Sequence, residues 1–387
     1  MAKTISSVEM ISRLVSFDTT SRSSNLALIN FVRDYLDGFG IKSELVHDAG
    51  RRKANLYATI GPDDRGGVLL SGHSDVVPID GQEWESEPFT VKEHDGKLYG
   101  RGASDMKSFL AIALAMAPNF RNARLATPLH IALTYDEEVG CLGVRPLIAA
   151  LAGKPVKPRL CIVGEPTSMQ PVGGHKGKKS LRCHVHGFES HSALAHAGVN
   201  AIEAAAEIVA HLRGMARKKR AEGPFDPDFV PSYTTIHTGT IAGGTALNIV
   251  PRECHFEFEI RALPSEDPEA LCDELRKFAA TLLPEMQRVS EQTGIVFEEF
   301  NDTPALVATE DDAAVQLARA LTGANGVGKV AYVTEGGLYK QSGIPTVICG
   351  PGSIEQAHKP NEFIALDQVQ QCEGFMRRLL TQLMQPV

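Results

Sequence analysis

Strand-like and helix-like patterns alternate along most of this chain, and the alternation is interrupted once. In the first 175 residues, short β-rich runs at residues 55–60 and 129–135 are separated by stretches with apolar side chains at helical spacing, such as residues 106–117. Strands that alternate with helices form βαβ units and therefore favour a largely parallel sheet. The sequence predicts an α/β fold built on a mixed, largely parallel sheet.

The interruption lies between residues 178 and 298, where the pattern becomes that of a compact α+β unit. The alternation of strand and helix resumes near residue 304. The simplest interpretation is one domain made of residues 1–177 and 299–387, interrupted by a smaller inserted domain at residues 178–298. The elements expected in the insertion are strands at 180–186, 232–241, 253–261 and 294–300, and helices at 198–216 and 267–283.

Composition and charge argue against several classes of protein. Hydrophobic residues make up 43% and charged residues 22% of the 387 residues, which is typical of globular chains and not of disordered ones. The net charge of −8 argues against a nucleic-acid or anionic-membrane partner, because both require a concentrated basic surface. No apolar run approaches the roughly 20 residues that span a bilayer. We therefore expect no nucleic-acid partner and no membrane partner.

The seven cysteines are widely spaced, and none forms a Cys-x-x-Cys pair. This usage is typical of a reducing compartment and argues against both a disulfide framework and a thiolate zinc site. The N-terminal stretch is amphipathic and lacks the apolar core of a signal peptide. The sequence therefore predicts a cytoplasmic protein.

Acids and histidines follow the ends of predicted strands in several separate segments. Open α/β sheets build their ligand sites at the carboxyl ends of their strands, although a single acid or histidine there is more often a cap. Together the segments supply imidazoles and carboxylates without a thiolate, a ligand set that suits divalent metals, most commonly zinc. The side chains concerned are His73, Asp75, Asp105, Asp136, Glu137, Glu138, Glu165 and His358.

Two of these segments have a local arrangement that fits a metal centre. His73 and Asp75 are two residues apart and share one face of an extended strand, where Asp75 can hold the ring N–H that faces away from a metal. A simple loop ion pair is the alternative. Residues 136–138 place three acids directly after an apolar strand, and a bound cation would relieve their repulsion. One carboxylate as ligand and its neighbour as proton shuttle would explain this cluster.

The segments GHSDVVP, GRGASDMK, DEEVG, GEPT and AHKPNE occur in this order along the chain. In this order they resemble the motifs of the co-catalytic dizinc aminoacylase/carboxypeptidase family, and the resemblance covers nearly the whole chain. It implies a zinc-exopeptidase-like catalytic domain and an inserted dimerisation or lid domain. Residues 164–172 and 350–360 are also very similar to the corresponding stretches of bacterial acetylornithine deacetylases.

The resemblance implies roles for individual residues in a centre of two Zn²⁺ ions, which Co²⁺ can replace. Asp105 would bridge the two ions, Asp75 would orient His73, and Glu137 would be the general base toward a water shared by the ions. In this family the peptide bond after the bridging aspartate is cis, which we expect at Asp105–Met106. The other metal ligands would be His73 and Glu165 at one ion, and Glu138 and His358 at the second.

Further roles are implied for residues of the inserted domain. His191, in a segment similar to the family's HS…P…GNAI motif, would reach across a homodimer and stabilise the oxyanion in the partner's site. Ala195 stands where this motif commonly has proline. Asn248 and Arg261 resemble family residues that bind the substrate α-carboxylate. The alternatives are a surface histidine and, for Arg261, a strand-end ion pair.

The resemblance implies metal-dependent hydrolysis of N-acetyl-L-ornithine to acetate and L-ornithine, a step of arginine biosynthesis. Charge complementarity suggests that Glu335, followed by Gly336, meets the cationic side chain of ornithine. The alternative substrates are N-succinyl-diaminopimelate, N-acetylcitrulline, N-acetylmethionine and dipeptides. A catalytically inactive binding protein on the same scaffold would lack the base or the bridging acid, and both Glu137 and Asp105 are present. A serine hydrolase is excluded because no G-x-S-x-G motif occurs.

Overall fold

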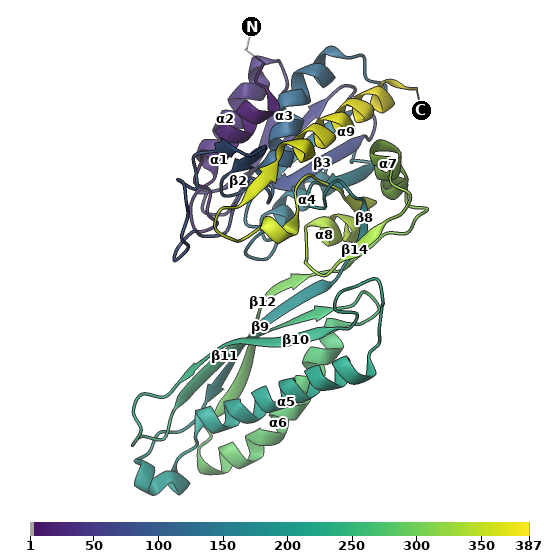
Figure 1. The fold of residues 1–387 in the computed structure, drawn as a ribbon. Coiled ribbons are helices and arrows are strands. Elements are labelled where there is room, and N and C mark those ends of the chain that lie inside the picture. Colours follow the sequence, from purple (N-terminus) through teal and green to yellow (C-terminus); the bar gives the residue numbers. More distant parts are fainter. Residues whose placement is uncertain (1–3, 387) are drawn as a thin grey trace. The chain divides into compact units, whose positions relative to one another are not determined.

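The computed structural model describes residues 4–386 and divides into two compact units (Figure 1). The larger unit contains residues 4–174, 306–329 and 334–386, and the smaller contains residues 175–305 and 330–333. Each unit has its own hydrophobic core. The sequence pattern does not indicate that the short segment 330–333 clusters with the smaller unit.

A mixed sheet forms the centre of the larger unit. Its middle strands pair in parallel, from β6 through β3 and β7 to β15, whereas its outer strands pair antiparallel where the register is defined. This arrangement confirms the α/β class with a mixed sheet. The strand order is β1 (Ser43–His47), β2 (Ala54–Ile60), β6 (Leu129–Thr134), β3 (Val68–His73), β7 (Leu160–Val163), β15 (Thr346–Ile348), β8 (Val172–His175) and β13 (Leu306–Val307), with β14 (Gly328–Val330) paired to β8.

Helices cover both faces of this sheet, which is why its middle strands are continuous apolar runs. On one face, Val68 and Leu70 of β3 join a core shared with helices of the N- and C-terminal segments. On the other face, Ser71 of β3 hydrogen-bonds the hydroxyl of Tyr339, 2.9 Å away in α8. The helices of this unit are α1 (Ser7–Val15), α2 (Leu26–Gly38), α3 (Lys107–Asn122), α4 (Val144–Ala152), α7 (Ala313–Thr322), α8 (Gly336–Gln341), α9 (Leu366–Met384) and the 3₁₀ turn η2 (Ile354–Gln356).

The helix α3 is the central helix of the larger unit. Its sequence is apolar nearly all round, so it is buried between α1, α9 and the sheet. It begins at Lys107, directly after the Asp105–Met106 peptide bond, which is cis as expected. Asp105, two residues before α3, is buried.

A second, small sheet connects two segments that are far apart in the sequence. It consists of β4 (Lys92–His94), β5 (Lys97–Tyr99) and β16 (Phe363–Ala365), with β16 paired antiparallel to β5. This pairing brings the loop before α3 next to the loop that contains His358.

The smaller unit is an antiparallel sheet with two long helices, in the order β10-β11-β9-β12. Along β9 and β11 buried and accessible side chains alternate, and the buried ones pack against α5 and α6. Asn200 caps α5, and Asp267 followed by Pro268 begins α6. The elements are β9 (Gly177–His186), η1 (Ser192–Ala197), α5 (Ala201–Glu222), β10 (Thr235–Gly243), β11 (Glu253–Ala262), α6 (Pro268–Val289) and β12 (Gly294–Thr303).

None of the helices formed by residues 4–386 combines the length and the apolar character that a membrane span requires.

Candidate metal centre

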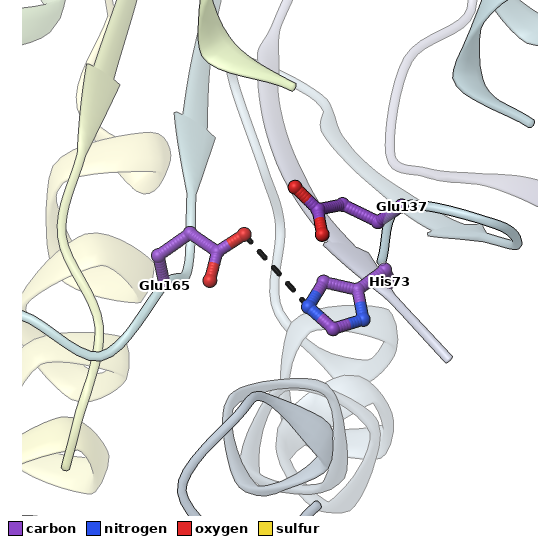
Figure 2. Close-up of side chains that lie close together, drawn as sticks. All are labelled: His73, Glu137 and Glu165. Atoms are coloured by element: carbon purple, nitrogen blue, oxygen red, sulfur yellow. Dashed lines mark ion pairs between the residues drawn. The ribbon is translucent and has the colours of Figure 1, made fainter. Parts of the chain in front are cut away.

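The predicted metal ligands of the larger unit follow neighbouring strands of the mixed sheet. His73 is the last residue of β3, residues 136–138 follow β6, and Glu165 follows β7. Because β6, β3 and β7 are adjacent and parallel, their carboxyl ends meet at one edge of the sheet. Figure 2 shows His73, Glu137 and Glu165 pointing toward one another at this edge.

Among the described residues, two groups of side chains could each hold a metal ion. His73, Glu137 and Glu165 form one group, and His73, Asp105 and Glu138 form the other, with all candidate ligand atoms of a group within 4.8 Å of one another. His73 Nε2 lies 3.8 Å from Glu165 Oε1, the contact drawn in Figure 2. The two groups share one imidazole and therefore form one continuous cluster.

Asp105 lies between the two predicted histidine ligands. Its Oδ1 is 2.9 Å from His73 Nε2, and its Oδ2 is 3.4 Å from His358 Nε2. His358 Nε2 is also 3.0 Å from Glu138 Oε2. One carboxylate thus faces both imidazoles with different oxygens, which is the arrangement that a bridging ligand requires.

Asp75 supports the cluster in a different way from the one expected. The ring Nδ1–H of His73 donates to the Asp75 backbone carbonyl at 2.9 Å, whereas the Asp75 carboxylate lies 3.6 Å from Nδ1. The carboxylate instead accepts from the backbone N–H groups of Glu137 (3.1 Å) and Glu138 (3.3 Å). Asp75 therefore fixes the ring of His73 through its main chain and holds the acidic turn through its side chain.

The third acid of the run after β6 has a separate partner. Asp136 accepts from the ammonium group of Lys53, and both side chains are largely buried. Asp136 also has φ of 55°, in the left-handed region, where the chain turns sharply after the strand. This turn directs the next two side chains, Glu137 and Glu138, toward the cluster.

The electrostatics of the cluster reflect several carboxyl groups in a small, enclosed volume. Burial raises the pKa of Glu165 well above its ordinary value, and burial with the nearby Asp105 charge raises the pKa of Glu138. Burial also raises the pKa of Glu137 to about 8, with Glu138 and Asp105 adding to the effect against His73. A divalent cation would favour the charged form of every one of these acids.

In the two imidazoles and Asp105, by contrast, the neighbouring groups shift each pKa in the direction that favours the charged form. Hydrogen bonds with Asp105 and Glu138 raise the pKa of His358 to about 10. Burial opposes protonation of His73, yet Asp105 and Glu165 hold its pKa well above the usual value. Burial likewise opposes ionisation of Asp105, but His358 and His73 keep its pKa below its ordinary value. Positive charge at the two rings thus stabilises this carboxylate.

The donor set fits borderline divalent ions such as zinc, because it consists of imidazole nitrogens and carboxylate oxygens at one sheet edge. A thiol that sequence reasoning missed also lies here, since Cys141 Sγ donates to Glu137 Oε1 at 3.4 Å. Burial and the neighbouring acids raise the pKa of Cys141 well above its usual value, so it stays protonated and is a poor metal ligand.

Comparison with known proteins agrees with this geometry. A family model described as peptidase family M20/M25/M40 matches residues 69–382. The acetylornithine deacetylase of Proteus mirabilis is 36% identical over 94% of this chain and 91% of its own, and that of Pasteurella multocida is 34% identical over 99% of both. The chain belongs to peptidase family M20/M25/M40. It is therefore a metal-dependent hydrolase.

Solved structures share the fold of this M20 member at lower identity. The M20 family metallo-carboxypeptidase Sso-CP2 of Sulfolobus solfataricus has a TM-score of 0.76 at 18% identity, with 98% of this chain and 99% of that chain covered. The aminopeptidase PepT of Bacillus cereus has a TM-score of 0.73 at 19% identity, with 99% and 100% covered. The YXEP protein of Bacillus subtilis, described as a dinuclear metal binding peptidase, has a TM-score of 0.67 at 17% identity, with 98% and 99% covered.

In the smaller unit of this M20 member, two of the remaining predicted site residues lie side by side. The exposed His191 precedes η1, and its Nδ1 accepts from the backbone N–H of Ala193 at 3.1 Å. His191 forms an isolated β-bridge with Ile249, and Ser192 N–H donates to the Asn248 carbonyl at 3.0 Å. The structure thus brings His191 and Asn248 onto neighbouring, accessible backbone.

Arg261 is paired with another side chain, and Glu335 is buried. Arg261 Nε donates to Glu259 Oε1 at 2.8 Å, which is the strand-end ion pair considered as the alternative. Glu335 directly precedes α8 and is 1% exposed, and its burial raises its pKa to about 7. The N–H of the adjacent Gly336 donates to Thr334 Oγ1 at 3.0 Å. A substrate ammonium would reach Glu335 only after the surrounding groups move.

Proposed function

We propose that this chain hydrolyses N-acetyl-L-ornithine to acetate and L-ornithine, with two Zn²⁺ ions, replaceable by Co²⁺, held at the edge of the mixed sheet of the larger unit. The observation that carries the proposal is Asp105, whose two oxygens face His73 and His358. The substrate rests on the names of relatives at 34–37% identity. Arginine biosynthesis, a cytoplasmic location and a homodimer formed through the smaller unit belong to the same proposal.

The ligands proposed are those of the sequence prediction. His73 and Glu165 would hold one ion, Glu138 and His358 the other, and Asp105 both. When bound, the ions would polarise the amide carbonyl and lower the pKa of a nearby water. His73 is prepared for this role, because its Nδ1–H is already held by the Asp75 carbonyl and its Nε2 faces the cluster.

Glu137 is the proposed general base. Its carboxylate is within 4.8 Å of the ligand atoms of His73 and Glu165 and is the one acid of the cluster that the proposal leaves free of metal. It would take a proton from the attacking water as the new carbon–oxygen bond forms. It would then deliver that proton to the ornithine nitrogen as the carbon–nitrogen bond breaks. Acetate and the free amine are the products.

Glu137→Gln tests this assignment, because glutamine keeps the shape of the side chain and removes the base. We expect kcat with N-acetyl-L-ornithine to fall by at least about 10³-fold while the metal content per chain stays at the wild-type value. Asp136→Asn, the neighbouring acid paired with Lys53, is the matched control and should keep kcat within about tenfold. Near-normal turnover of Glu137→Gln would contradict the base, and loss of one metal ion would make Glu137 a ligand.

The substrate-binding residues and the action across the dimer remain part of the proposal. His191, supplied by a partner subunit, would stabilise the oxyanion, and Asn248 and Arg261 would bind the α-carboxylate. Glu335, followed by Gly336, would meet the ornithine ammonium. For Arg261, engagement requires exchange of its present partner, Glu259, for the substrate carboxylate.

A further inference from the structure

Glu362 connects two loops that carry proposed metal ligands. It lies at the end of the loop that contains His358, and it is 1% exposed. Its Oε1 accepts from the backbone N–H of Ser104 at 2.8 Å and of Asp105 at 3.0 Å. A single carboxylate oxygen therefore holds the main chain on which the proposed bridging ligand stands, across 257 residues of sequence.

The other oxygen of Glu362 has its own partner. Arg101 NH1 donates to Oε2 at 2.7 Å, and both side chains are 1% exposed, so this is a fully enclosed ion pair. Such a pair requires that its charges be matched by further hydrogen bonds, because both ions have lost their water. Glu362 meets this requirement with two backbone donors, which are groups that a neutral apolar side chain could not hold.

Arg101 is fixed in turn by a third segment. Its NH2 donates to Gln82 Oε1, and its guanidinium carbon lies 5.1 Å from the centre of the Trp84 ring. Gln82 Nε2 also donates to the His358 backbone carbonyl at 3.0 Å. The segment around Gln82 thus contacts both Arg101 and the residue proposed as the second histidine ligand.

We propose that Glu362, held by Arg101, is a positioning residue that sets the place of the Asp105 carboxylate relative to His358 and thereby the affinity of the centre for both metal ions. This inference rests on the proposed metal centre and adds to it two residues outside the ligand set. Residues behind metal ligands change metal affinity by about 10- to 100-fold when they are removed. Because Asp105 would bridge the ions, both binding events should respond.

The test is Co²⁺ titration of the metal-free full-length protein, followed by visible absorption and calorimetry. We expect wild type to bind two equivalents. Glu362→Gln keeps an acceptor for the two N–H groups but loses the charge, so both equivalents should bind about tenfold more weakly; Glu362→Met, without an acceptor, should bind about 100-fold more weakly. Both variants should also show an altered cobalt spectrum, which a purely structural role would leave unchanged.

Two further variants separate positioning from general stability. Glu266→Gln breaks a largely buried ion pair with Lys219 in the smaller unit, so it should lower the unfolding temperature and leave Co²⁺ affinity unchanged. Arg101→Lys keeps the charge and removes the planar fork, and should weaken Co²⁺ binding even if Glu362→Met fails to fold.

The outcomes distinguish this inference from the proposed function. Folded Glu362→Gln and Arg101→Lys that both bind two Co²⁺ with wild-type affinity and spectrum would overturn the positioning role and leave the metal centre intact. Equal losses of affinity in Glu266→Gln would also overturn it, because the effect would then follow stability alone. Wild-type protein that binds no Co²⁺ would instead contradict the metal centre itself.

Discussion

At the scale of single residues, Asp105 contacts both histidines of the cluster, and Asp75 holds the residues around it in place. Asp105 presents a different oxygen to each of His73 and His358. Asp75 accepts the His73 ring N–H with its carbonyl, while its carboxylate accepts from the backbone of Glu137 and the next residue. The positions of His73 and Glu138 are therefore fixed by hydrogen bonds that would leave their metal-binding atoms free.

His130 provides a residue-scale prediction of pH dependence far from the cluster. It is 4% exposed on β6, next to Thr59, and burial together with the Lys154 charge lowers its pKa to about 4. An unfolded chain holds histidine near its usual pKa of about 6.5, so between roughly pH 6.5 and 4 the unfolded state binds a proton that the folded state does not. The titration of His130 therefore leaves the unfolding free energy unchanged above this window and lowers it as the pH decreases through the window.

Substitution by glutamine removes this titration. Between pH 7 and pH 5, wild type should lose about 2 kcal/mol more of its unfolding free energy than His130→Gln. Urea unfolding at the two pH values measures the difference, and the exposed His94→Gln serves as control. Parallel pH profiles for wild type and His130→Gln would contradict the lowered pKa.

At the scale of elements, the backbone directly after β7 packs closely against α3. A Cβ added to Gly164 would lie 2.0 Å from the ring of Phe109, so only glycine fits between strand and helix at this point. The next residue is Glu165, one of the proposed ligands. The close packing of β7 on α3 thus determines where that ligand enters the cluster.

Gly164→Ala should therefore destabilise the protein by about 1–3 kcal/mol through overpacking. Phe109→Leu in the same chain should recover part of this loss, because it makes room for the new methyl group, so the two changes should be non-additive. Denaturant unfolding provides the measurement. Gly326→Ala, where an added Cβ meets nothing within 4 Å, is the control and should change stability by less than about 0.5 kcal/mol. Strict additivity would contradict the packing argument.

The elements that could be predicted from sequence are those with a strong local pattern. The buried strands β3, β6 and β7 are apolar runs in the sequence, and the acids and histidine that follow them are visible in the sequence alone. The short strands β4, β5 and β16 were not predicted, because three residues carry too little periodicity. Pairing of β16 with β5 nevertheless brings Glu362 to Asp105.

The remaining features of the candidate site depend on contacts between distant residues. Sequence spacing indicated that Asp75 faces His73, but not that the carbonyl would be closer than the carboxylate. No local sequence pattern predicts the buried ion pair of Arg101 with Glu362, although the two residues lie in the segments GRGASDMK and AHKPNE that resemble family motifs. Such contacts are set by tertiary packing, which pattern reasoning along the chain does not reach.

At the scale of the whole molecule, the chain combines a mixed-sheet unit that contains the complete proposed ligand set with an antiparallel unit that contains His191 and Asn248. The ligand set comes from segments between residues 73 and 358, so its assembly requires the larger unit to fold across the insertion. The resemblance to M20/M25/M40 peptidases over residues 69–382 includes both units. Metal-dependent hydrolysis follows from this membership.

The most direct test is kcat/KM of the Zn²⁺-loaded protein for N-acetyl-L-ornithine beside N-acetylcitrulline, N-acetylmethionine and N-succinyl-diaminopimelate, with chelator-treated protein as control. We expect N-acetyl-L-ornithine to exceed each of the others by at least about tenfold, because only its side chain offers a single compact cation, and we expect activity to disappear with the metal and return with it. A clear preference for another member of the panel, or full activity of the metal-free protein, would contradict the proposed function.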